Sequence, residues 1–513
     1  MPMETAKPYT LQDLLVHTAK ERPDKVWLRE KAGKDIAEKR FGEMLMDCRR
    51  VSAFLRRQGK APIHAGLLGV SGIACLTCLF GSVIDGNVAV PIDPQLGAEE
   101  IMDNLNRADV TVLFYDRRFR ALTETMRERC PQITAYVCFT AEEGCLSLPE
   151  LLAQEEAAEL RPVEAQSCAC ILYTSGTTGK SKGVMLSHAN LIDNAFCCDN
   201  EGSAEDVLLS VLPIHHAYCL TCDVLLSLRY GATLCINDSP MRLVQNIKLF
   251  KPTLLLLVPL IAETIYRRIM AEKKKNPLLP LRMAGRAVFG KDLRVIFCGG
   301  AYLSPELSKA YEKMGLPLLQ GYGMTECSPR IASSSQADPS TGADVGRVVK
   351  NCRVKIEDGE IMVKSPSVML GYYRNEEATR EMFTEDGWLK TGDLGYVKDQ
   401  RVYITGRRKN LIILANGENV SPEELENRFA GSEWLSEIMV YSENEQITAE
   451  VYPFPEYASK AEALFRKKVE EINRQVPSAR RIIRLRLRDR EFEKTTSRKI
   501  KRNQTGEKGR LLD

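Results

Sequence analysis

The segment YTSGTTGKSKGVMLSHANL, residues 173–191, concentrates side chains that can bind phosphate. Glycines allow backbone N–H groups to turn toward an anion, while hydroxyl and ammonium groups add donors and positive charge. A Walker loop is excluded, because that pattern requires glycine five residues before Gly179, where Thr174 stands. The segment therefore predicts a polyphosphate-binding loop, with a flexible surface turn as the alternative. The glycines, hydroxyl residues and lysines concerned are Gly176, Gly179, Gly183, Thr174, Ser175, Thr177, Thr178, Ser181, Lys180 and Lys182.

Aliphatic runs alternate with amphipathic helical stretches through the sequence on both sides of this loop. The runs at 65–70, 87–93 and 110–116 read as buried strands, and the stretch 261–275 reads as a helix between the runs 253–259 and 293–300. Such alternation predicts βαβ units and mainly parallel sheets.

The pattern changes after residue 335, where alternating residues predict β-hairpins. One hairpin turns at Asp358 and Gly359, and a second turns at Lys398, Asp399 and Gln400. Further on, Ser421 is the expected N-cap of a helix with Pro422 at its first position. A strand at 437–443 and a helix at 462–476 precede a strongly basic end.

Length and charge narrow the classes of protein that this chain can represent. A chain of 513 residues is too long for one core, and 71 basic against 68 acidic residues give a net charge of +3. This balance argues against a protein built to neutralise nucleic-acid phosphates. The uncharged run 65–84 divides into a strand and a helix, so we expect no transmembrane segment.

The 16 cysteines include two CLTC segments, at Cys75–Cys78 and Cys219–Cys222. Paired cysteines near His215 and His216 could bind zinc, but both segments lie in apolar, helix-like runs. We therefore expect buried thiols that pack as small hydrophobic groups. The N-terminus has no secretory pattern, so a cytoplasmic protein with reduced cysteines is expected.

Six segments in order resemble the motifs of the acyl-adenylate-forming superfamily, which includes acyl-CoA synthetases, peptide-synthetase adenylation domains and beetle luciferase. The resemblance spans nearly the whole chain and is strongest to fatty acyl-CoA synthetases. Besides 173–191, the segments are GGAYL (299–303), GYGMTE (321–326), GWLKTGDLGY (387–396), ITGRRKNLIILANGENVSPEELE (404–426) and KTTSRKIKR (494–502).

The resemblance implies an α/β fold with two domains. A large N-terminal domain, residues 1–408, would contain layered mixed and parallel sheets with helices, divided at about 1–165, 166–335 and a small β-rich part, 336–408. A smaller, mobile α+β lid would span 409–513, with Lys409 as the hinge.

The resemblance also assigns roles to single residues. Glu326 and Thr177 would hold Mg²⁺, which takes few protein ligands. Lys499 would be catalytic with both of them, because its ammonium can contact the attacking carboxylate and the α-phosphate together. Tyr322 would stack on adenine, Asp393 would accept from both ribose hydroxyls, and Arg407 would donate to the ribose or a phosphate. ATP or AMP would be bound by Thr174, Ser175, Gly176, Thr178, Gly179, Lys182, Gly300, Ala301, Gly321, Tyr322, Gly323, Met324, Thr325, Asp393 and Arg407.

In the last motif, Arg498 stands where the family usually has glycine, and Glu493 replaces a usual proline. Some long-chain acyl-CoA synthetases also lack that glycine, so Arg498 is interpreted as a subfamily feature. Gly417 and Glu418 would face coenzyme A.

The acyl pocket is expected at His216 and Gly323, with an apolar tail against Ile214 and Ala217. No Asp in this segment is placed to bind an α-amine, which favours a plain carboxylic acid.

The predicted function is ATP-dependent activation of a medium- or long-chain fatty acid as acyl-AMP, followed by transfer to coenzyme A. Three alternatives stay open: transfer to an acyl carrier protein, a ligand-binding paralogue disabled by Arg498, and a binder of membrane or nucleic acid through the basic tail at 480–502. Small-molecule substrates are the expected partners, without nucleic acid and with at most weak contact to a membrane surface.

Overall fold

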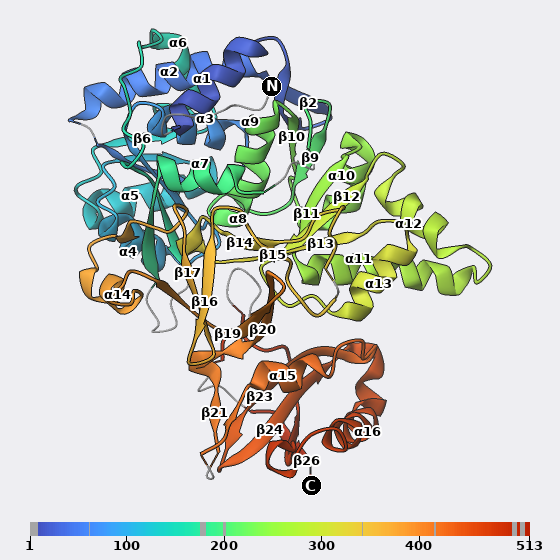
Figure 1. Cartoon of the computed structure of the whole chain (residues 1–513). Coiled ribbons are helices and arrows are strands. Elements are labelled where there is room, and N and C mark those ends of the chain that lie inside the picture. The colour runs from blue at the N-terminus through green and yellow to red at the C-terminus, as the bar shows by residue number, and fades with distance from the viewer. Residues whose placement is uncertain are drawn as a thin grey trace.

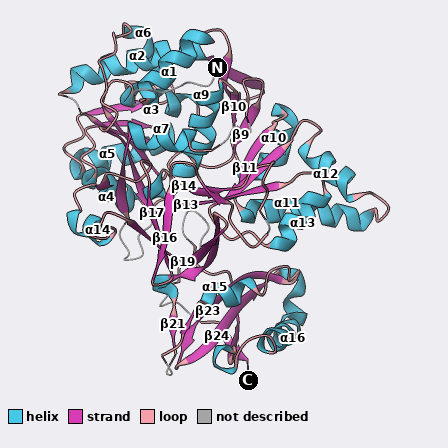
Figure 2. Cartoon of the chain, in the orientation of Figure 1, coloured by secondary structure: helices cyan, strands magenta, loops and turns pink. Residues whose placement is uncertain are grey.

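A computed structural model describes residues 9–60, 62–174, 181–198, 202–340, 342–414, 417–494, 500–502 and 508–512 (Figure 1). The chain forms a large body of two sheets with flanking helices and a smaller C-terminal domain below it, so the α/β fold class expected from the sequence is confirmed (Figure 2). Among the described residues, no helix is both long and apolar enough to cross a bilayer.

The first sheet has 13 strands in the order β16-β17-β19-β20-β15-β14-β13-β12-β11-β9-β10-β1-β2. The adjacent strands β13, β12, β11, β9, β10 and β1 are parallel to one another. At the two ends of this group, β14 pairs antiparallel with β13 and β2 pairs antiparallel with β1. In sheet order the strands are Arg353–Glu357, Glu360–Lys364, Leu389–Lys398, Arg401–Arg407, Arg347–Val348, Arg330–Ser333, Leu318–Gly323, Val295–Gly299, Leu254–Leu257, Val207–Ser210, Thr233–Ile236, Val26–Ala32 and Asp35–Arg40.

The second sheet has seven strands in the order β18-β8-β7-β4-β3-β5-β6. Strands β7, β4, β3, β5 and β6 are parallel, whereas β8 and β18 add antiparallel edges. In sheet order they are Gly371–Tyr372, Lys182–Ser187, Cys168–Thr174, Val88–Ile92, His64–Leu68, Val112–Tyr115 and Ala135–Cys138.

Helices cover the sheets and supply much of the core (Figure 2). Helix α3 is almost wholly buried, which explains the long uncharged run in the sequence. The helices of the body are α1 Leu11–Glu21, α2 Phe41–Gln58, α3 Ile73–Val83, α4 Ala98–Arg107, α5 Arg120–Arg129, α6 Leu148–Gln154, α7 His188–Phe196, α8 Ala217–Cys219, α9 Leu226–Tyr230, α10 Leu243–Phe250, α11 Pro259–Lys275, α12 Leu281–Phe289, α13 Pro305–Lys313 and α14 Glu376–Glu381.

Short helical turns complete the body. They are η1 Arg117–Phe119, η2 Leu220–Leu225, η3 Pro240–Arg242 and η4 Thr325–Cys327. The turn η2 has π-helical geometry and joins α8 to α9. All four cysteines of the two CLTC segments are buried in α3, α8 and η2, as expected of packing residues.

Both predicted hairpins form. Strands β16 and β17 pair through Glu357 and Glu360, and positive φ angles of 50° at Asp358 and 75° at Gly359 suit a two-residue turn. In the second hairpin Lys398 pairs with Arg401, so the turn consists of Asp399 and Gln400 alone. The sequence interpretation that placed Lys398 in this turn was therefore one residue too wide.

The C-terminal domain has its own sheet and core. Strands β23 to β26 form a four-stranded sheet in chain order, and α15 and α16 pack on it. Ser421 caps α15 by accepting the backbone N–H of Glu424, as predicted. The elements of this region are η5 Arg408–Asn410, β21 Ile412–Ile413, β22 Asn419–Val420, α15 Pro422–Asn427, β23 Leu435–Glu443, β24 Gln446–Pro453, η6 Pro455–Lys460, α16 Ala461–Asn473, η7 Ser478–Arg480, β25 Arg484–Leu487 and β26 Arg510–Leu512.

One arginine of the body contacts the C-terminal domain directly. The guanidinium of Arg267 on α11 lies 3.9 Å from the ring centroid of Phe454 and donates to the carbonyl of Leu435 at 3.3 Å. This contact fixes one relative position of the two parts of the chain.

Candidate active site

The predicted phosphate-binding segment includes parts of two antiparallel strands. Strands β7 and β8 pair with Thr174 opposite Lys182. Asn104 accepts hydrogen bonds from Ser181 at 2.8 Å and from the Tyr173 hydroxyl at 2.9 Å. The predicted phosphate-binding residues Ser175, Gly176, Thr177, Thr178 and Gly179 lie outside the described residues.

Lys182 and Glu326 are connected through an aromatic ring that the sequence interpretation did not identify. The ammonium of Lys182 lies 4.9 Å from the ring centroid of Tyr372, whose hydroxyl donates to Glu326 at 2.7 Å. Burial, and then the Glu326 charge, raise the pKa of Tyr372, so its hydroxyl remains a donor. The Glu326 carboxylate is thus held in a fixed orientation.

Tyr322, Asp393 and Arg407 form a second connected group. The Tyr322 hydroxyl donates to one Asp393 oxygen at 2.7 Å, and Arg407 Nε lies 2.9 Å from the other. Asp393 and Arg407 are paired residues of β19 and β20, and Asp393 is only 5% exposed. Each carboxylate oxygen retains a further acceptor site, so Asp393 can still bind a hydroxyl-bearing ligand.

Glycines allow backbone segments to pack closely against one another at the ends of β12 and β13. A Cβ on Gly299 would lie 2.9 Å from the carbonyl of Gly321 and 3.5 Å from the Tyr218 ring. A Cβ on Gly323 would lie 1.9 Å from the carbonyl of Pro329, so no larger residue fits there. The predicted ligands Gly300 and Ala301 follow β12 directly, while Met324 and Thr325 follow β13.

The predicted pocket segment begins with two adjacent histidines. The His215 and His216 ring centroids lie 4.3 Å apart, and His215 Nε2 lies 3.6 Å from Asp93. Burial lowers the pKa of His215, and Asp93 opposes that shift. Sequence reasoning missed Asp93, although it follows β4, and the carboxyl ends of parallel strands are where ligands commonly bind.

The chain then passes through α8 into the π-helical turn η2, where Ile214 and Ala217 are buried nearby. Such π-helical turns are often found at functional sites.

The predicted hinge lies beside acidic residues of both parts of the chain. Lys409 belongs to η5, and burial, then Arg407, lower its pKa. Its neighbour Arg408 pairs with Glu360 at 2.7 Å, and Asn410 donates to Glu423 at 2.5 Å. The hinge residue therefore lies between contacts made to the body and to the C-terminal domain.

The two residues expected to face coenzyme A lie at the surface of the C-terminal domain. Gly417 is exposed with φ of 81°, and Glu418 pairs with Arg480 at 2.7 Å. The predicted catalytic residue Lys499 lies outside the described residues, as does Arg498.

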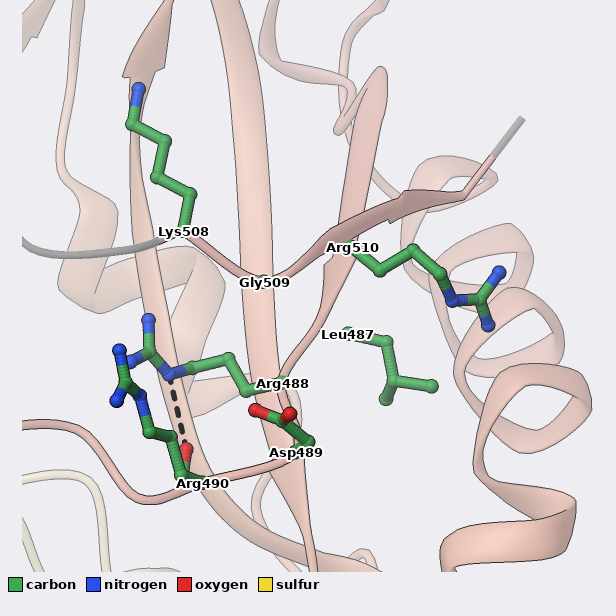
Figure 3. A pocket seen from close by; sticks show the side chains of 7 residues that line it. All are labelled: Leu487, Arg488, Asp489, Arg490, Lys508, Gly509 and Arg510. Atoms are coloured by element: carbon green, nitrogen blue, oxygen red, sulfur yellow. Dashed lines mark hydrogen bonds between the residues drawn. The ribbon is translucent and has the colours of Figure 1, made fainter.

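Many cations of the basic end are already paired with carboxylates. Arg486 lies 2.9 Å from Glu443, and Arg488 lies 2.7 Å from Glu450. Figure 3 shows a hollow beside these residues, where Arg488 donates to the Arg490 carbonyl at 3.1 Å. This pairing weakens the interpretation of the tail as a free basic surface. The hollow is lined by Leu487, Arg488, Asp489, Arg490, Lys508, Gly509 and Arg510.

Two family models together match most of the chain. A model described as AMP-binding enzyme matches residues 15–373, and a model described as AMP-binding enzyme C-terminal domain matches residues 409–508.

Curated relatives include ligases with fatty and with aromatic names. The Rattus norvegicus protein named long-chain-fatty-acid–CoA ligase 5 is 30% identical over 73% of this chain and 63% of its own length. The Narcissus pseudonarcissus protein named 4-coumarate-CoA ligase 2 is 32% identical over 67% of this chain and 63% of its own length. The chain thus spans less than two thirds of the length of these two relatives, and 60% of long chain acyl-CoA synthetase 6 of Arabidopsis thaliana.

Solved structures share the fold at low identity. The anthranilate CoA ligase AuaEII in complex with anthranoyl-AMP has a TM-score of 0.85 at 22% identity, with 97% of both chains covered. ATP-bound MatB from Rhodopseudomonas palustris has a TM-score of 0.82 at 23% identity, covering 96% of this chain and 97% of that one.

Proposed function

The chain belongs to the AMP-binding enzyme family, and we propose that it is an ATP-dependent acid–thiol ligase that forms an acyl-CoA through an acyl-adenylate. The observation that carries the proposal is the group of Tyr322, Asp393 and Arg407, where a buried carboxylate is held by a hydroxyl and a guanidinium. In that position Asp393 would accept hydrogen bonds from the ribose hydroxyls of ATP, and the Tyr322 ring would lie against adenine.

In the proposed first step, a carboxylate oxygen of the acid attacks the α-phosphorus of ATP. The bond to the bridging oxygen breaks, pyrophosphate leaves, and acyl-AMP remains. Such a step requires positioning and charge stabilisation rather than a covalent nucleophile. Lys499 would neutralise charge on the α-phosphate and the carboxylate, and the loop between Thr174 and Lys182 would hold the leaving phosphates.

Magnesium would be bound through Glu326. Mg²⁺ prefers oxygen ligands and retains waters and substrate phosphates, so one oriented carboxylate is enough. The hydrogen bond from Tyr372 leaves the second Glu326 oxygen without that donor, which suits a hard cation. Thr177 is the proposed second ligand. The ion would supply charge neutralisation on the phosphates during the first step.

In the proposed second step, the thiol of coenzyme A attacks the acyl carbon and AMP leaves. The C-terminal domain would first rotate about Lys409, which withdraws Lys499 and brings Gly417 and Glu418 toward the thiol. A glycine at 417 would permit close approach of the pantetheine chain to the backbone.

A medium- or long-chain fatty acid is the proposed substrate class. The buried residues Ile214 and Ala217 stand on either side of the His215–His216 pair in the chain and would offer an apolar wall to the acyl tail. Relatives named as long-chain ligases from animals, plants and bacteria support this choice, while those named for coumarate and indoleacetate make aromatic acids the competing class.

A panel of carboxylic acids tests both the ligase reaction and the proposed substrate class. Each acid is assayed for pyrophosphate exchange and for conversion of ATP to AMP with and without coenzyme A. We expect exchange that depends on the acid alone and AMP turnover that requires the thiol. If exchange occurs but the acyl group is transferred only to a phosphopantetheinyl carrier protein, that protein takes the place of coenzyme A as the acceptor. An absence of exchange with every acid would refute the ligase function.

A further inference from the structure

The proposed ribose-binding carboxylate lies in a bulge of strand β19. Strand β17 pairs irregularly with β19, so that residues 391–393 stand opposite the single residue 361. Gly392 has a φ of 73°, which glycine adopts without strain. Because a bulge changes the direction in which neighbouring side chains point, the orientation of Asp393 depends on this turn.

A buried carboxylate joins this bulge to the proposed hinge. Glu360 on β17 is only 3% exposed, and its Oε1 accepts the Gly392 N–H at 2.9 Å. Its Oε2 accepts a hydrogen bond from the Arg408 guanidinium at 2.7 Å. The two oxygens of one side chain thus bind two segments that are distant from Glu360 and from one another in the chain.

Each partner of Glu360 is next to a residue with a proposed role. Gly392 directly precedes Asp393. Arg408 lies between Arg407 and Lys409. Since Arg407 Nε also lies 2.9 Å from Asp393, the bulge and the end of β20 are held together at two points.

The other side of the hinge is held by the C-terminal domain. Asn410 donates to Glu423 of α15 at 2.5 Å. A rotation about Lys409 would therefore move Asn410 with the C-terminal domain, while Arg408 would stay with the body.

We propose that Glu360 is a positioning residue that couples nucleotide binding to the hinge. This inference rests on the proposed ligase function and adds a residue that acts through Arg408 and the bulge, without contact to a substrate. With the pair intact, a ribose held by Asp393 and Arg407 restrains the body side of the hinge, and bending is confined to Lys409. Without the pair the end of β20 loosens, which weakens both ATP binding and the effect of ATP on the hinge.

The competing explanation is that Glu360 only satisfies the groups buried around it. A buried carboxylate requires partners wherever it lies, because its charge is costly to withdraw from water. Glu450 in the C-terminal domain provides the matched control. It is 1% exposed, lies 2.7 Å from Arg488 and accepts the Gly509 N–H at 2.6 Å. It therefore makes the same two kinds of contact at a place with no proposed nucleotide-binding residue next to its partners.

The first measurement is the KM for ATP in pyrophosphate exchange. Glu360→Gln is isosteric and keeps an oxygen for the Gly392 N–H, but it removes the charge that binds Arg408. We expect it to raise KM about 3- to 10-fold, the effect of roughly one hydrogen bond. Arg408→Met should give the same rise, Arg408→Lys a smaller one and Glu450→Gln none. The double variant Glu360→Gln with Arg408→Met should be no worse than either single variant, because both changes break one contact.

The second measurement is trypsin cleavage at the hinge, where the Arg407 and Arg408 side chains are 47% and 52% exposed. In the wild type, saturating ATP and Mg²⁺ without an acid should slow cleavage after residues 407–409 by about tenfold, within the usual range for coupled sites. In Glu360→Gln this protection should fall to about threefold or less. Glu450→Gln should keep the protection whole.

Equal KM values and equal protection in Glu360→Gln and Glu450→Gln would overturn the coupling while leaving the ligase function in place. A wild type that exchanges pyrophosphate but gains no protection from ATP would do the same. If thermal unfolding shows that Glu360→Gln does not fold, the KM values of the two Arg408 variants decide, since that side chain is half exposed. Failure of exchange with every acid would overturn the ligase function and this inference together.

Discussion

The hydroxyl of Tyr322 donates a 2.7 Å hydrogen bond to Asp393, a residue 71 positions further along the chain. Tyr322 is the penultimate residue of β13 in the parallel part of the large sheet, and Asp393 lies on the long antiparallel strand β19. Burial, and then Asp393, raise the pKa of Tyr322, so the donor stays protonated. This bond links the proposed adenine-binding ring to the proposed ribose-binding carboxylate.

Asp393→Ala should therefore raise the KM for ATP by about 10- to 100-fold, because hydrogen bonds to a charged group contribute about 1.5–3 kcal/mol. Tyr322→Phe keeps the ring and should raise KM by less than tenfold, roughly one hydrogen bond. Tyr311→Phe is the control, since its buried hydroxyl donates to the Ala262 carbonyl at 2.8 Å, within the core. The KM for ATP is measured by steady-state kinetics. The same KM in all three variants would contradict a role of Asp393 and Tyr322 in ATP binding.

The proposed metal ligand gives a second prediction. Glu326→Gln should raise the Mg²⁺ concentration required for half-maximal exchange by about tenfold or more, because a neutral amide is a weaker ligand for a hard cation. Tyr372→Phe should produce a smaller rise, since it removes only the hydrogen bond that orients Glu326.

Tyr373→Phe is the matched control for this measurement. Tyr373 is the next residue and makes an equivalent 2.7 Å bond to Asp109 instead. If Tyr372→Phe and Tyr373→Phe raised the Mg²⁺ concentration for half-maximal exchange equally, the result would contradict a role of Tyr372 in orienting the metal ligand.

Lys499 carries the third prediction, which rests on the sequence motif because the residue lies outside the described part of the chain. Lys499→Ala should reduce acid-dependent pyrophosphate exchange by at least about 100-fold, since it removes a charge that acts in the transition state. Transfer from preformed acyl-AMP to coenzyme A should be nearly unchanged. Lys501→Ala, two positions away in the same basic segment, should leave both reactions intact. Equal loss of both half-reactions in Lys499→Ala would instead indicate a structural role.

Local sequence patterns predicted the elements well, because each depends on residues close together in the chain. The Asp358–Gly359 hairpin and the Ser421 cap of α15 are of this kind. Contacts between distant segments were not predictable in this way. Tyr372 reaches Glu326 only because β18 joins the edge of the second sheet, and no spacing in the sequence indicates that pairing.

The environment of Arg330 is the clearest example of this limit. In the sequence it is one arginine after a Ser-Pro pair, and nothing there indicates that its guanidinium binds Asn194 at the end of α7. Arg330 reaches α7 only because β14 pairs with β13 and so brings this residue to the helix end. Such a contact depends on tertiary packing, so it could be judged only in the folded chain.

A buried histidine gives a final prediction, on stability against pH. His188 begins α7 with no exposed surface, its Nδ1 accepts the Leu11 N–H at 3.3 Å, and burial lowers its pKa to about 4. Below the unfolded-state pKa of about 6.5, the unfolded chain binds a proton that the native chain does not. The free energy of unfolding therefore decreases as the pH is lowered from about 6.5 to about 4. The loss from this residue should reach about 2 kcal/mol at about pH 5. Thermal unfolding should show a smaller acid-induced decrease in Tm for His188→Gln than for the wild type. His17→Gln, at an exposed position beside Glu21, should retain the wild-type decrease, and an unchanged pH dependence in His188→Gln would assign the effect to other groups.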